Sequence, residues 1–272
     1  MRRLLGTLLV PAALLALSPV ASAAPDGDGG VEVVAHRGAS ADAPENTLAA
    51  VDEAIRQGAD SIEVDVQRTA DGHLVLLHDT TLVRTTDVAS VFPGRATAPV
   101  GTFTLAELQR LDAGSWFAPE FTGEPIPTLD ELIERTAGRA GLLIELKDPS
   151  SYPGIERQVA DAIGAPRPDV VVQSFDHDAM RRFAATAPEV PAGWLFATRP
   201  TDAQLDAAAA VADQTNPSFR VTDAALVTAV RSRGMEAGVY TVNSETDMRR
   251  MIDAGVQRII TDVPATLRAV LG

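Results

Sequence analysis

Three acidic residues lie near the ends of two candidate β-strands in this sequence. Glu63 and Asp65 are two apart in one extended run, so both side chains point to the same face of a sheet, and Glu145 lies in a similar run. Converging carboxylates repel one another unless a cation lies between them or one takes up a proton. All-oxygen ligands favour a hard divalent ion over zinc. The alternative is a salt-bridged core in which Arg37 and Lys147 neutralise the acids.

Two histidines, His36 and His78, also end extended runs. An unperturbed imidazole titrates near neutral pH, so one ring can accept a proton while the other donates one, as cleavage of a phosphodiester requires. Arg37 and Lys147 are the candidate phosphate binders, because the arginine fork matches two phosphate oxygens and the lysine offers a point charge. These residue types together predict acid–base chemistry at a phosphate ester, and the spacing leaves open whether the three acids bind a metal ion or pair with Arg37 and Lys147.

Side chains this far apart in sequence meet only if a fold gathers the strand ends. Short β-branched runs alternate with amphipathic helical patterns, which is typical of βα units and a parallel sheet. In a parallel barrel the catalytic groups lie at the C-terminal ends of the strands. We therefore predict an α/β fold, a (β/α)8 TIM barrel. Its eight strands are expected at 31–36, 61–66, 141–147, 170–175, 192–197, 209–213, 236–242 and 257–261.

Two features depart from the simple alternation. Residues 67–78 contain an Asp71-Gly72 turn between extended runs, which predicts a β-hairpin after the second strand that returns His78 to the barrel mouth. Residues 79–139 then form a small insertion before the third strand. The sixth strand is the least regular, since 208–212 also fits a helix, so a seven-stranded or open doubly wound sheet is the alternative.

The N-terminus has the layout of a signal peptide. Two arginines precede an apolar stretch of about 14 residues, which is shorter than the roughly 20 that a membrane span needs. Cleavage after Ala23 is expected, so residues 1–23 are the signal peptide, 24–30 a flexible lead-in and 31–272 one barrel domain. This predicts a secreted or periplasmic protein. The chain has no cysteine, so its stability cannot depend on disulfides.

The charge balance restricts the partners. The net charge is −14, and removing Arg2 and Arg3 with the signal peptide leaves 21 basic against 37 acidic residues, or −16. Nucleic acid and anionic membranes are therefore poor partners, and no stable membrane insertion or protein partner is expected. A small phosphate-bearing substrate needs a local positive site, which a bound cation with Arg37 and Lys147 would supply.

The motifs and their order resemble the glycerophosphodiester phosphodiesterase family along nearly the whole chain. The N-terminal signature is carried by His36-Arg37-Gly38, Pro44-Glu45-Asn46-Thr47, Glu63-Val64-Asp65-Val66, Asp71-Gly72 and His78-Asp79. It continues in Ile144-Glu145-Leu146-Lys147, Gln173-Ser174-Phe175, Thr241-Val242-Asn243 and Thr261-Asp262. One departure is Tyr240, where the family commonly has tryptophan.

The resemblance implies roles for specific residues. A single divalent ion, Ca²⁺ in preference to Mg²⁺, would be bound by Glu63, Asp65 and Glu145, with His36 and His78 as general acid and base. Phosphate and substrate binding would fall to Arg37, Lys147, Gln173, Tyr240 and Asn243. The implied reaction is the metal-dependent hydrolysis of glycerophosphodiesters such as glycerophosphocholine to sn-glycerol 3-phosphate and an alcohol.

Several alternatives stay open at this level. The nucleophile is either the glycerol 2-hydroxyl or a water molecule. The same residues also resemble a phospholipase D-like activity on lysolipids or sphingomyelin, which would need exposed apolar residues around the mouth. The aromatic residues of the insertion would either serve that purpose or form its small core: Phe92, Phe103, Trp116, Phe117 and Phe121. A non-catalytic binder of polyol phosphates is the third alternative, because fold alone does not settle function.

Overall fold

The computed structural model describes residues 30–164 and 167–272. The predicted signal peptide and nearly all of the lead-in lie outside these residues, so both stay predictions. The described strands are β1 Glu32–His36, β2 Ser61–Arg68, β3 Leu74–Leu76, β4 Gly141–Leu146, β5 Val170–Ser174, β6 Ala192–Phe196, β7 Gln214–Pro217, β8 Glu236–Val239 and β9 Arg258–Thr261.

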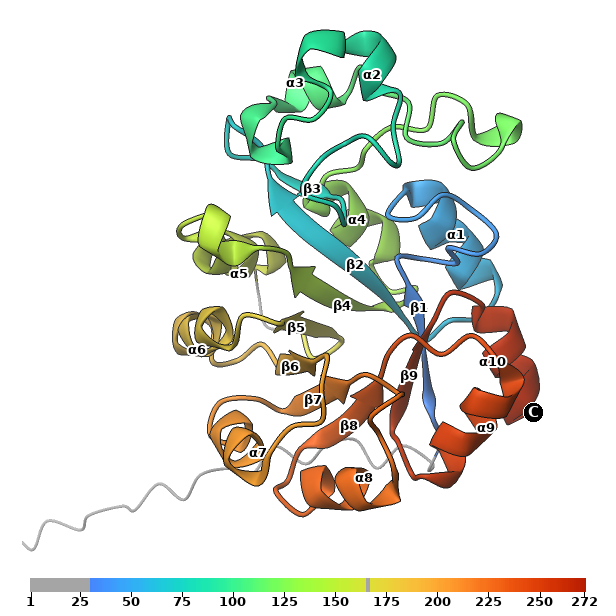
Figure 1. Ribbon diagram of the computed structural model, residues 1–272, viewed down its shortest axis with the longest axis vertical. Helices are drawn as coiled ribbons and strands as arrows, with labels where there is room; N and C mark the ends of the chain where they lie inside the picture. Colours follow the sequence, from blue (N-terminus) through green and yellow to red (C-terminus); the bar gives the residue numbers. More distant parts are fainter. Residues whose placement is uncertain (1–29, 165–166) are drawn as a thin grey trace, which may run out of the picture. The chain divides into compact units, whose positions relative to one another are not determined.

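Eight of these strands form a closed parallel barrel. The sheet runs β1-β9-β8-β7-β6-β5-β4-β2, and pairing of β1 with β2 closes it. Short antiparallel β3 pairs with the outer part of β2. The predicted TIM barrel is therefore confirmed, and the open sheet and the seven-stranded barrel are excluded (Figure 1).

Helices cover the outside of the barrel (Figure 1). Most begin at a side chain that accepts a hydrogen bond from the first turn, as Thr128 does with a full capping box and Asp223 with a single bond. Their apolar faces pack on the outward-facing residues of the strands. The helices of this layer are α1 Leu48–Arg56, α4 Leu129–Thr136, α5 Ile155–Ile163, α6 His177–Thr186, α7 Asp202–Ala209, α8 Ala224–Arg231, α9 Glu245–Asp253 and α10 Pro264–Leu271.

The predicted sixth strand, 209–213, is wrong. Ala209 is the last residue of α7, and the strand is β7, Gln214–Pro217. Polar residues form it because Gln214 and Asn216 alternate toward the barrel interior, where they are buried. Periodicity analysis looks for apolar runs and passes over a strand of this composition.

The β-hairpin forms where the sequence predicts it. Val66 pairs with Leu76 and Arg68 with Leu74, and Gly72 in the turn has φ of 90°, which favours glycine. A hydrogen bond from the Leu77 amide to the Asp65 carbonyl, 2.9 Å long, returns the chain to the barrel mouth.

The segment after the hairpin has a hydrophobic core of its own. Leu82, Val88, Val100, Phe103 and Leu108 form its fully buried centre. Helix α4 packs instead with the main barrel core, so the predicted range 79–139 includes one helix of the barrel layer. The inserted segment lies beyond the outer ends of β2 and β3 (Figure 1). It contains α2 Val88–Val91, α3 Leu105–Leu108 and the 3-10 turns Pro93–Arg95, Val100–Thr102 and Pro119–Phe121.

A small apolar layer fills the barrel below the strand ends. Val34, Leu143 and Ile260 form this cluster and are almost fully buried. Val34 and Leu143 each lie two residues before a polar residue of the strand end, so they occupy the layer directly beneath it. This layer gives the polar residues above it a dry, close-packed floor. Among the described residues, no helix combines the length and apolar character needed to cross a membrane.

Candidate active site

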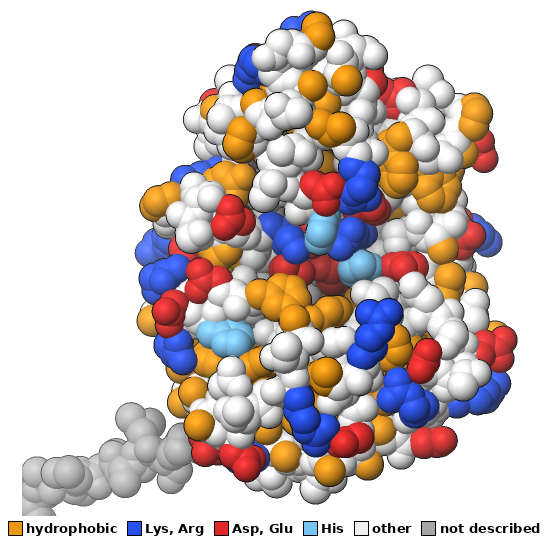
Figure 2. Space-filling model, viewed as in Figure 1, with side chains coloured by type: hydrophobic (Ala, Val, Ile, Leu, Met, Phe, Trp, Pro, Cys, Tyr) orange, Lys and Arg blue, Asp and Glu red, His pale blue; other side chains and the backbone are white. Residues whose placement is uncertain are grey.

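The register of the paired barrel strands places predicted site residues side by side at the C-terminal ends of the strands. His36 is in register with Glu63, and Asp65 with Glu145, although these pairs are 27 and 80 positions apart in the chain. The C-terminal strand ends form a hollow in which histidine, acidic and basic side chains gather (Figure 2). The pocket there has a volume of about 210 Å³.

The carboxylates of Glu63, Asp65 and Glu145 converge in this hollow. One oxygen from each lies within 4.8 Å of the others, and all three residues are buried. Burial raises the pKa of Glu63 well above its ordinary range, and the charges of Asp65 and Glu145 raise it further. Burial and the charge of Asp65 raise the pKa of Glu145 to about 7. A positive charge in addition to those of Arg37 and Lys147 would favour the ionised forms of both carboxyls.

Asp65 behaves differently from its two neighbours. Burial alone would raise the pKa of Asp65, but the positive charges of Arg37 and Lys147 hold it below its ordinary value. Its Oδ2 lies 3.0 Å from Arg37 Nε and accepts a 2.9 Å hydrogen bond from Asn46 Nδ2. Its Oδ1 is buried at 3.5 Å from Lys147 Nζ and has no hydrogen-bond partner among residues 30–164 and 167–272.

Strained backbone after β1 brings Arg37 and Asn46 into place. Both adopt positive φ, 58° in each case, which non-glycine residues rarely do outside sites that require it. The Arg37 amide thereby donates a 3.0 Å hydrogen bond to Glu63 Oε2. Gly38 follows with φ of 82°, and a Cβ there would lie 2.6 Å from the backbone of Ala50 in α1. Only glycine allows α1 to approach this closely.

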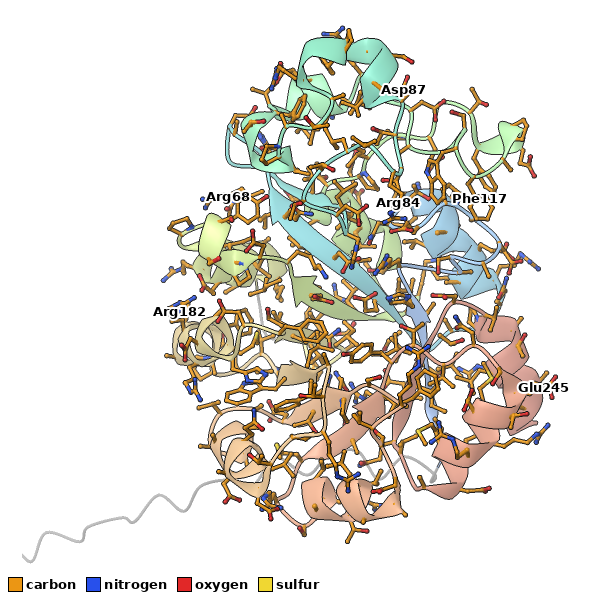
Figure 3. All side chains as sticks on the ribbon, in the orientation of Figure 1. Arg68, Arg84, Asp87, Phe117, Arg182 and Glu245 are labelled. Carbon is orange, nitrogen blue, oxygen red and sulfur yellow. The ribbon has the colours of Figure 1, made fainter. Side chains whose placement is uncertain are left out.

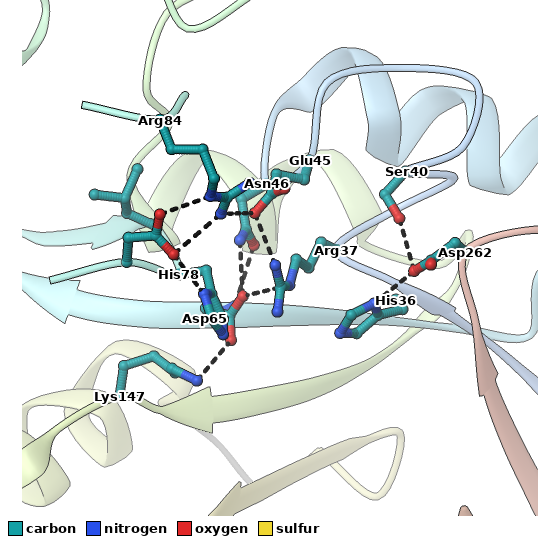
Figure 4. Close-up of polar contacts among 12 residues, drawn as sticks. His36, Arg37, Ser40, Glu45, Asn46, Asp65, His78, Arg84, Lys147 and Asp262 are labelled. Atoms are coloured by element: carbon teal, nitrogen blue, oxygen red, sulfur yellow. Dashed lines mark hydrogen bonds and ion pairs between the residues drawn. The ribbon is translucent and has the colours of Figure 1, made fainter. Parts of the chain in front are cut away.

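Each candidate catalytic histidine has a carboxylate at Nδ1. His36 Nδ1 lies 2.6 Å from Asp262 Oδ1, and His78 Nδ1 lies 2.8 Å from Asp79 Oδ1 (Figure 4). A carboxylate at Nδ1 fixes the ring and keeps the proton on that nitrogen, so Nε2 is left to exchange protons. Burial lowers the pKa of His78 below its ordinary value, although Asp65 opposes this effect. His36 Nε2 lies 4.0 Å from Glu63 Oε2.

Hydrogen bonds from Gln67 hold the loop that carries His78. The buried amide of Gln67 donates to the carbonyls of Leu77, His78 and Asp79, at 2.8, 3.3 and 2.7 Å. Its Oε1 accepts a 2.9 Å hydrogen bond from Tyr152. One side chain thus fixes three consecutive backbone groups beside the pocket.

Lys147 lies at the end of β4 beside two of the acids. Its Nζ donates a 2.8 Å hydrogen bond to Glu145 Oε1. Burial would lower the pKa of Lys147, but the charges of Glu145 and Asp65 raise it, so the side chain stays cationic. Arg37 likewise keeps its charge, because the acids around it raise its pKa against the effect of burial.

The remaining predicted binding residues differ in position. Gln173 lines the pocket and accepts a 2.7 Å hydrogen bond from buried Asn216. Tyr240 also lines it; its hydroxyl donates to the Phe196 carbonyl at 3.1 Å, and its ring lies edge-on to Phe175 at 5.8 Å. Asn243 lines a neighbouring pocket instead, where it donates to Asp262 Oδ2 at 2.5 Å.

Sequence reasoning assigned no role to four residues that support the site, Glu45, Asp79, Arg84 and Asp262. Asp262 follows the end of parallel strand β9, so the rule that functional groups lie just beyond parallel strands could have found it. Asp79 follows His78 directly after antiparallel β3, so its only sequence signal is its position beside that histidine. Glu45 accepts a 2.8 Å hydrogen bond from Arg37. Arg84 lies in the insertion, and no sequence signal connects it to the barrel.

Comparisons with known proteins agree with this geometry. The model of the glycerophosphoryl diester phosphodiesterase family matches residues 36–266. A glycerophosphodiester phosphodiesterase from Caldanaerobacter subterraneus subsp. tengcongensis is 40% identical over 239 residues, covering 86% of this chain and 95% of the relative. One from Bacillus subtilis is 34% identical over 251 residues, covering 85% and 83% respectively.

Solved structures give the same result. A phosphodiesterase from Oleispira antarctica, in complex with the product sn-glycerol-3-phosphate, has a TM-score of 0.78 at 30% identity, covering 89% of this chain and 96% of that one. A glycerophosphodiester phosphodiesterase from Agrobacterium tumefaciens has a TM-score of 0.69 at 33% identity, covering 88% and 99%. The chain belongs to the glycerophosphoryl diester phosphodiesterase family and is an enzyme of that class.

Proposed function

We propose that the enzyme hydrolyses glycerophosphodiesters to sn-glycerol 3-phosphate and an alcohol, with a divalent cation bound by Glu63, Asp65 and Glu145. The observation that carries this proposal is the convergence of the three carboxylates, two of which, Glu63 and Glu145, line one pocket with His36 and His78. The Oleispira antarctica relative, solved with sn-glycerol-3-phosphate, supports the same product.

The three carboxylates fit a hard divalent ion. Two cationic side chains, Arg37 and Lys147, lie against them, which leaves one negative charge uncompensated when all three acids are ionised. Asp65 Oδ1 is a buried acceptor that receives no hydrogen bond from the described part of the chain. All donors are oxygens, which suits Ca²⁺ or Mg²⁺; we propose Ca²⁺. When bound, the ion would neutralise phosphate charge and stabilise the charge that develops in the transition state.

Arg37 and Lys147 would bind the phosphate from the protein side. Both line the pocket and keep their positive charge at neutral pH. Ion pairs to the acids hold both side chains in place before substrate arrives, so little reorganisation is needed at the moment of reaction.

His36 and His78 would move the protons. Their Nδ1 atoms are occupied by Asp262 and Asp79, which leaves Nε2 of each ring for the substrate. One ring takes the proton of the attacking hydroxyl, from the glycerol 2-position or from water, as its oxygen bonds to phosphorus. The other ring donates a proton to the alcohol oxygen as its bond to phosphorus breaks. If the 2-hydroxyl attacks, a cyclic phosphate forms first, and a water molecule must then add to phosphorus and break the bond to the 2-oxygen to give sn-glycerol 3-phosphate.

The pocket suits a small diester. Its second wall is formed by Phe175, Leu195, Tyr240 and Ile260, an apolar surface for glycerol or alcohol carbons. At about 210 Å³ it lies below the roughly 300–1,000 Å³ typical of sites for drug-sized ligands. Phe103 is buried in the core of the insertion and Phe92 packs against it, whereas Trp116 is 39% exposed and lies edge-on to Phe117. The small volume of the pocket favours a glycerophosphodiester over a lysolipid.

A coupled assay of glycerol 3-phosphate release tests the proposal. Enzyme stripped with EDTA should be inactive on glycerophosphocholine, and added Ca²⁺ should restore activity to wild type but not to Glu63→Gln. Undiminished activity after EDTA treatment would remove the metal from the account. Metal-restored activity on lysophosphatidylcholine but not on glycerophosphocholine would favour the lipid substrate, and no hydrolysis of any diester would favour a non-catalytic binder.

A further inference from the structure

Arg84 joins two loops that belong to different barrel strands. Its Nη1 and Nη2 donate to the carboxylate of Glu45 at 2.6 and 2.8 Å, and its Nε and Nη2 donate to that of Asp79 at 2.6 and 3.1 Å. The guanidinium is planar with five donors in a fixed fork, so it can form two hydrogen bonds to each of two carboxylates, which the three donors of lysine cannot do. Figure 3 shows Arg84 between the inserted segment and the barrel.

Each of these two carboxylates also accepts a hydrogen bond from a residue with a proposed role in the reaction. Asp79 accepts from Nδ1 of His78 at 2.8 Å, and Glu45 accepts from Nη1 of Arg37 at 2.8 Å. Neither Asp79 nor Glu45 lines the pocket that His36, His78 and Glu145 line. The Arg84 guanidinium therefore holds in place the carboxylate that orients His78 and the carboxylate that orients Arg37 (Figure 4).

The backbone on either side of Arg84 is anchored in the insertion. Leu82 is fully buried in the core of that segment, and Thr85 and Thr86 are also buried. The Thr80 carbonyl accepts a 3.0 Å hydrogen bond from the Val100 amide. The position of the guanidinium is thus set by the fold of the insertion rather than by a free surface loop.

We propose that Arg84 is a positioning residue for catalysis, through which the inserted segment orients His78 and Arg37; this rests on the proposed function of the site. Arg84 acts through Asp79 and Glu45 and does not touch the substrate. Hydrogen bonds from Arg84 hold the pKa of Asp79 at about 2, so this carboxylate stays ionised beside His78 across the working pH range. Removing the guanidinium frees Asp79 to rotate away from Nδ1.

The test compares Arg84→Ala and Arg84→Lys with two matched controls. Arg199 forms a bidentate pair with Asp223 at 3.0 Å, and its side chain is 46% exposed against 44% for Arg84, so Arg199→Ala measures the loss of an exposed ion pair. Arg95 pairs with Glu107 inside the insertion, so Arg95→Ala measures a loosening of that segment.

We expect Arg84→Ala to lower kcat for glycerophosphocholine by roughly 10–100-fold, as is typical for residues that orient functional groups. KM should rise by a smaller factor, because Arg37 keeps its contact with Asp65. Arg84→Lys should fall between Arg84→Ala and wild type. Added guanidinium at non-denaturing concentration should raise kcat of Arg84→Ala and of neither control.

A second readout does not depend on turnover. The chain has four histidines, so ¹⁵N NMR of the imidazoles can be assigned by substitution. Wild-type His78 should carry its proton on Nδ1, and Arg84→Ala should show a mixture of tautomers at His78 with His36 unchanged.

Either of two results would overturn the proposal. One is kcat of Arg84→Ala equal to that of either control, with no response to guanidinium. The other is an unchanged His78 tautomer in Arg84→Ala. Wild-type release of glycerol 3-phosphate reports separately on the proposed function, and the tautomer comparison stays informative if wild type does not cleave this substrate.

Discussion

Replacing Glu145 by Gln should stabilise the metal-free enzyme while abolishing its activity. In the folded, metal-free protein Glu145 keeps its proton up to about pH 7, whereas the ordinary value is 4.5. This raised pKa contributes stability that is complete below pH 4.5 and is lost as pH rises through about 7. At pH 8 the wild-type protein must therefore bury an ionised carboxylate beside Asp65, which the variant avoids.

The size of the effect follows from the same pKa. The interval between 4.5 and about 7 corresponds to about 3 kcal/mol, at about 1.4 kcal/mol for each pH unit. The substitution also weakens the charged hydrogen bond from Lys147, so the net gain at pH 8 should be about 1–3 kcal/mol. For a chain of this size, that is a rise in Tm of about 3–10 °C.

Thermal and urea unfolding of EDTA-treated proteins at pH 5 and pH 8 measure this directly. Glu145→Gln should match wild type at pH 5 and exceed it at pH 8, and added Ca²⁺ should stabilise wild type more than the variant. Glu156→Gln is the control, because Glu156 is buried but pairs with Arg182 at 2.7 Å, so its loss should destabilise. The pKa of Glu145 is not raised by burial if the Glu145→Gln protein is less stable than wild type at pH 8, or if its gain in stability does not grow with pH.

Three further predictions concern the same strand ends. Asp262→Asn should lower kcat by roughly 10–100-fold with a smaller change in KM, because Nδ1 of His36 loses its charged partner; steady-state kinetics with an unaltered kcat would contradict this role. Arg37→Lys should raise KM for the diester by roughly tenfold, because a point charge replaces the fork that matches phosphate; a wild-type KM would assign phosphate binding elsewhere. Gly38→Ala should lower the free energy of unfolding by roughly 2–5 kcal/mol, because the new Cβ meets the backbone of Ala50 at a positive φ; equal urea midpoints for variant and wild type would show that α1 moves aside without cost.

The sequence was sufficient to predict the closed barrel and the level at which the polar residues gather. Strand-end residues such as His36, Glu63 and Glu145 follow apolar runs whose period and spacing are clear, and parallel strands place their C-terminal ends together. The sixth strand was not predictable in this way. Gln214 and Asn216 are polar, and their burial becomes visible only when the barrel closes around them.

The pairings that support the site could not be predicted from the sequence, even where the residue itself lies at a strand end. The pairing of His36 with Asp262 spans 226 positions and depends on β1 lying beside β9, which is a property of closure. Arg84 reaches Glu45 across 39 positions through an insertion whose path no periodic pattern predicts. The type of a residue indicates which chemistry its side chain can perform, whereas its hydrogen-bond partners depend on the three-dimensional path of the chain.

Anomalous diffraction from crystals soaked in Mn²⁺, a hard ion with a usable signal, locates the cation directly. We predict one strong anomalous peak bounded by carboxylate oxygens of Glu63, Asp65 and Glu145, and no peak at this position in Glu63→Gln crystals. A wild-type crystal with no peak at these oxygens, or with its strongest peak elsewhere, would contradict the assignment of the three acids as the metal site.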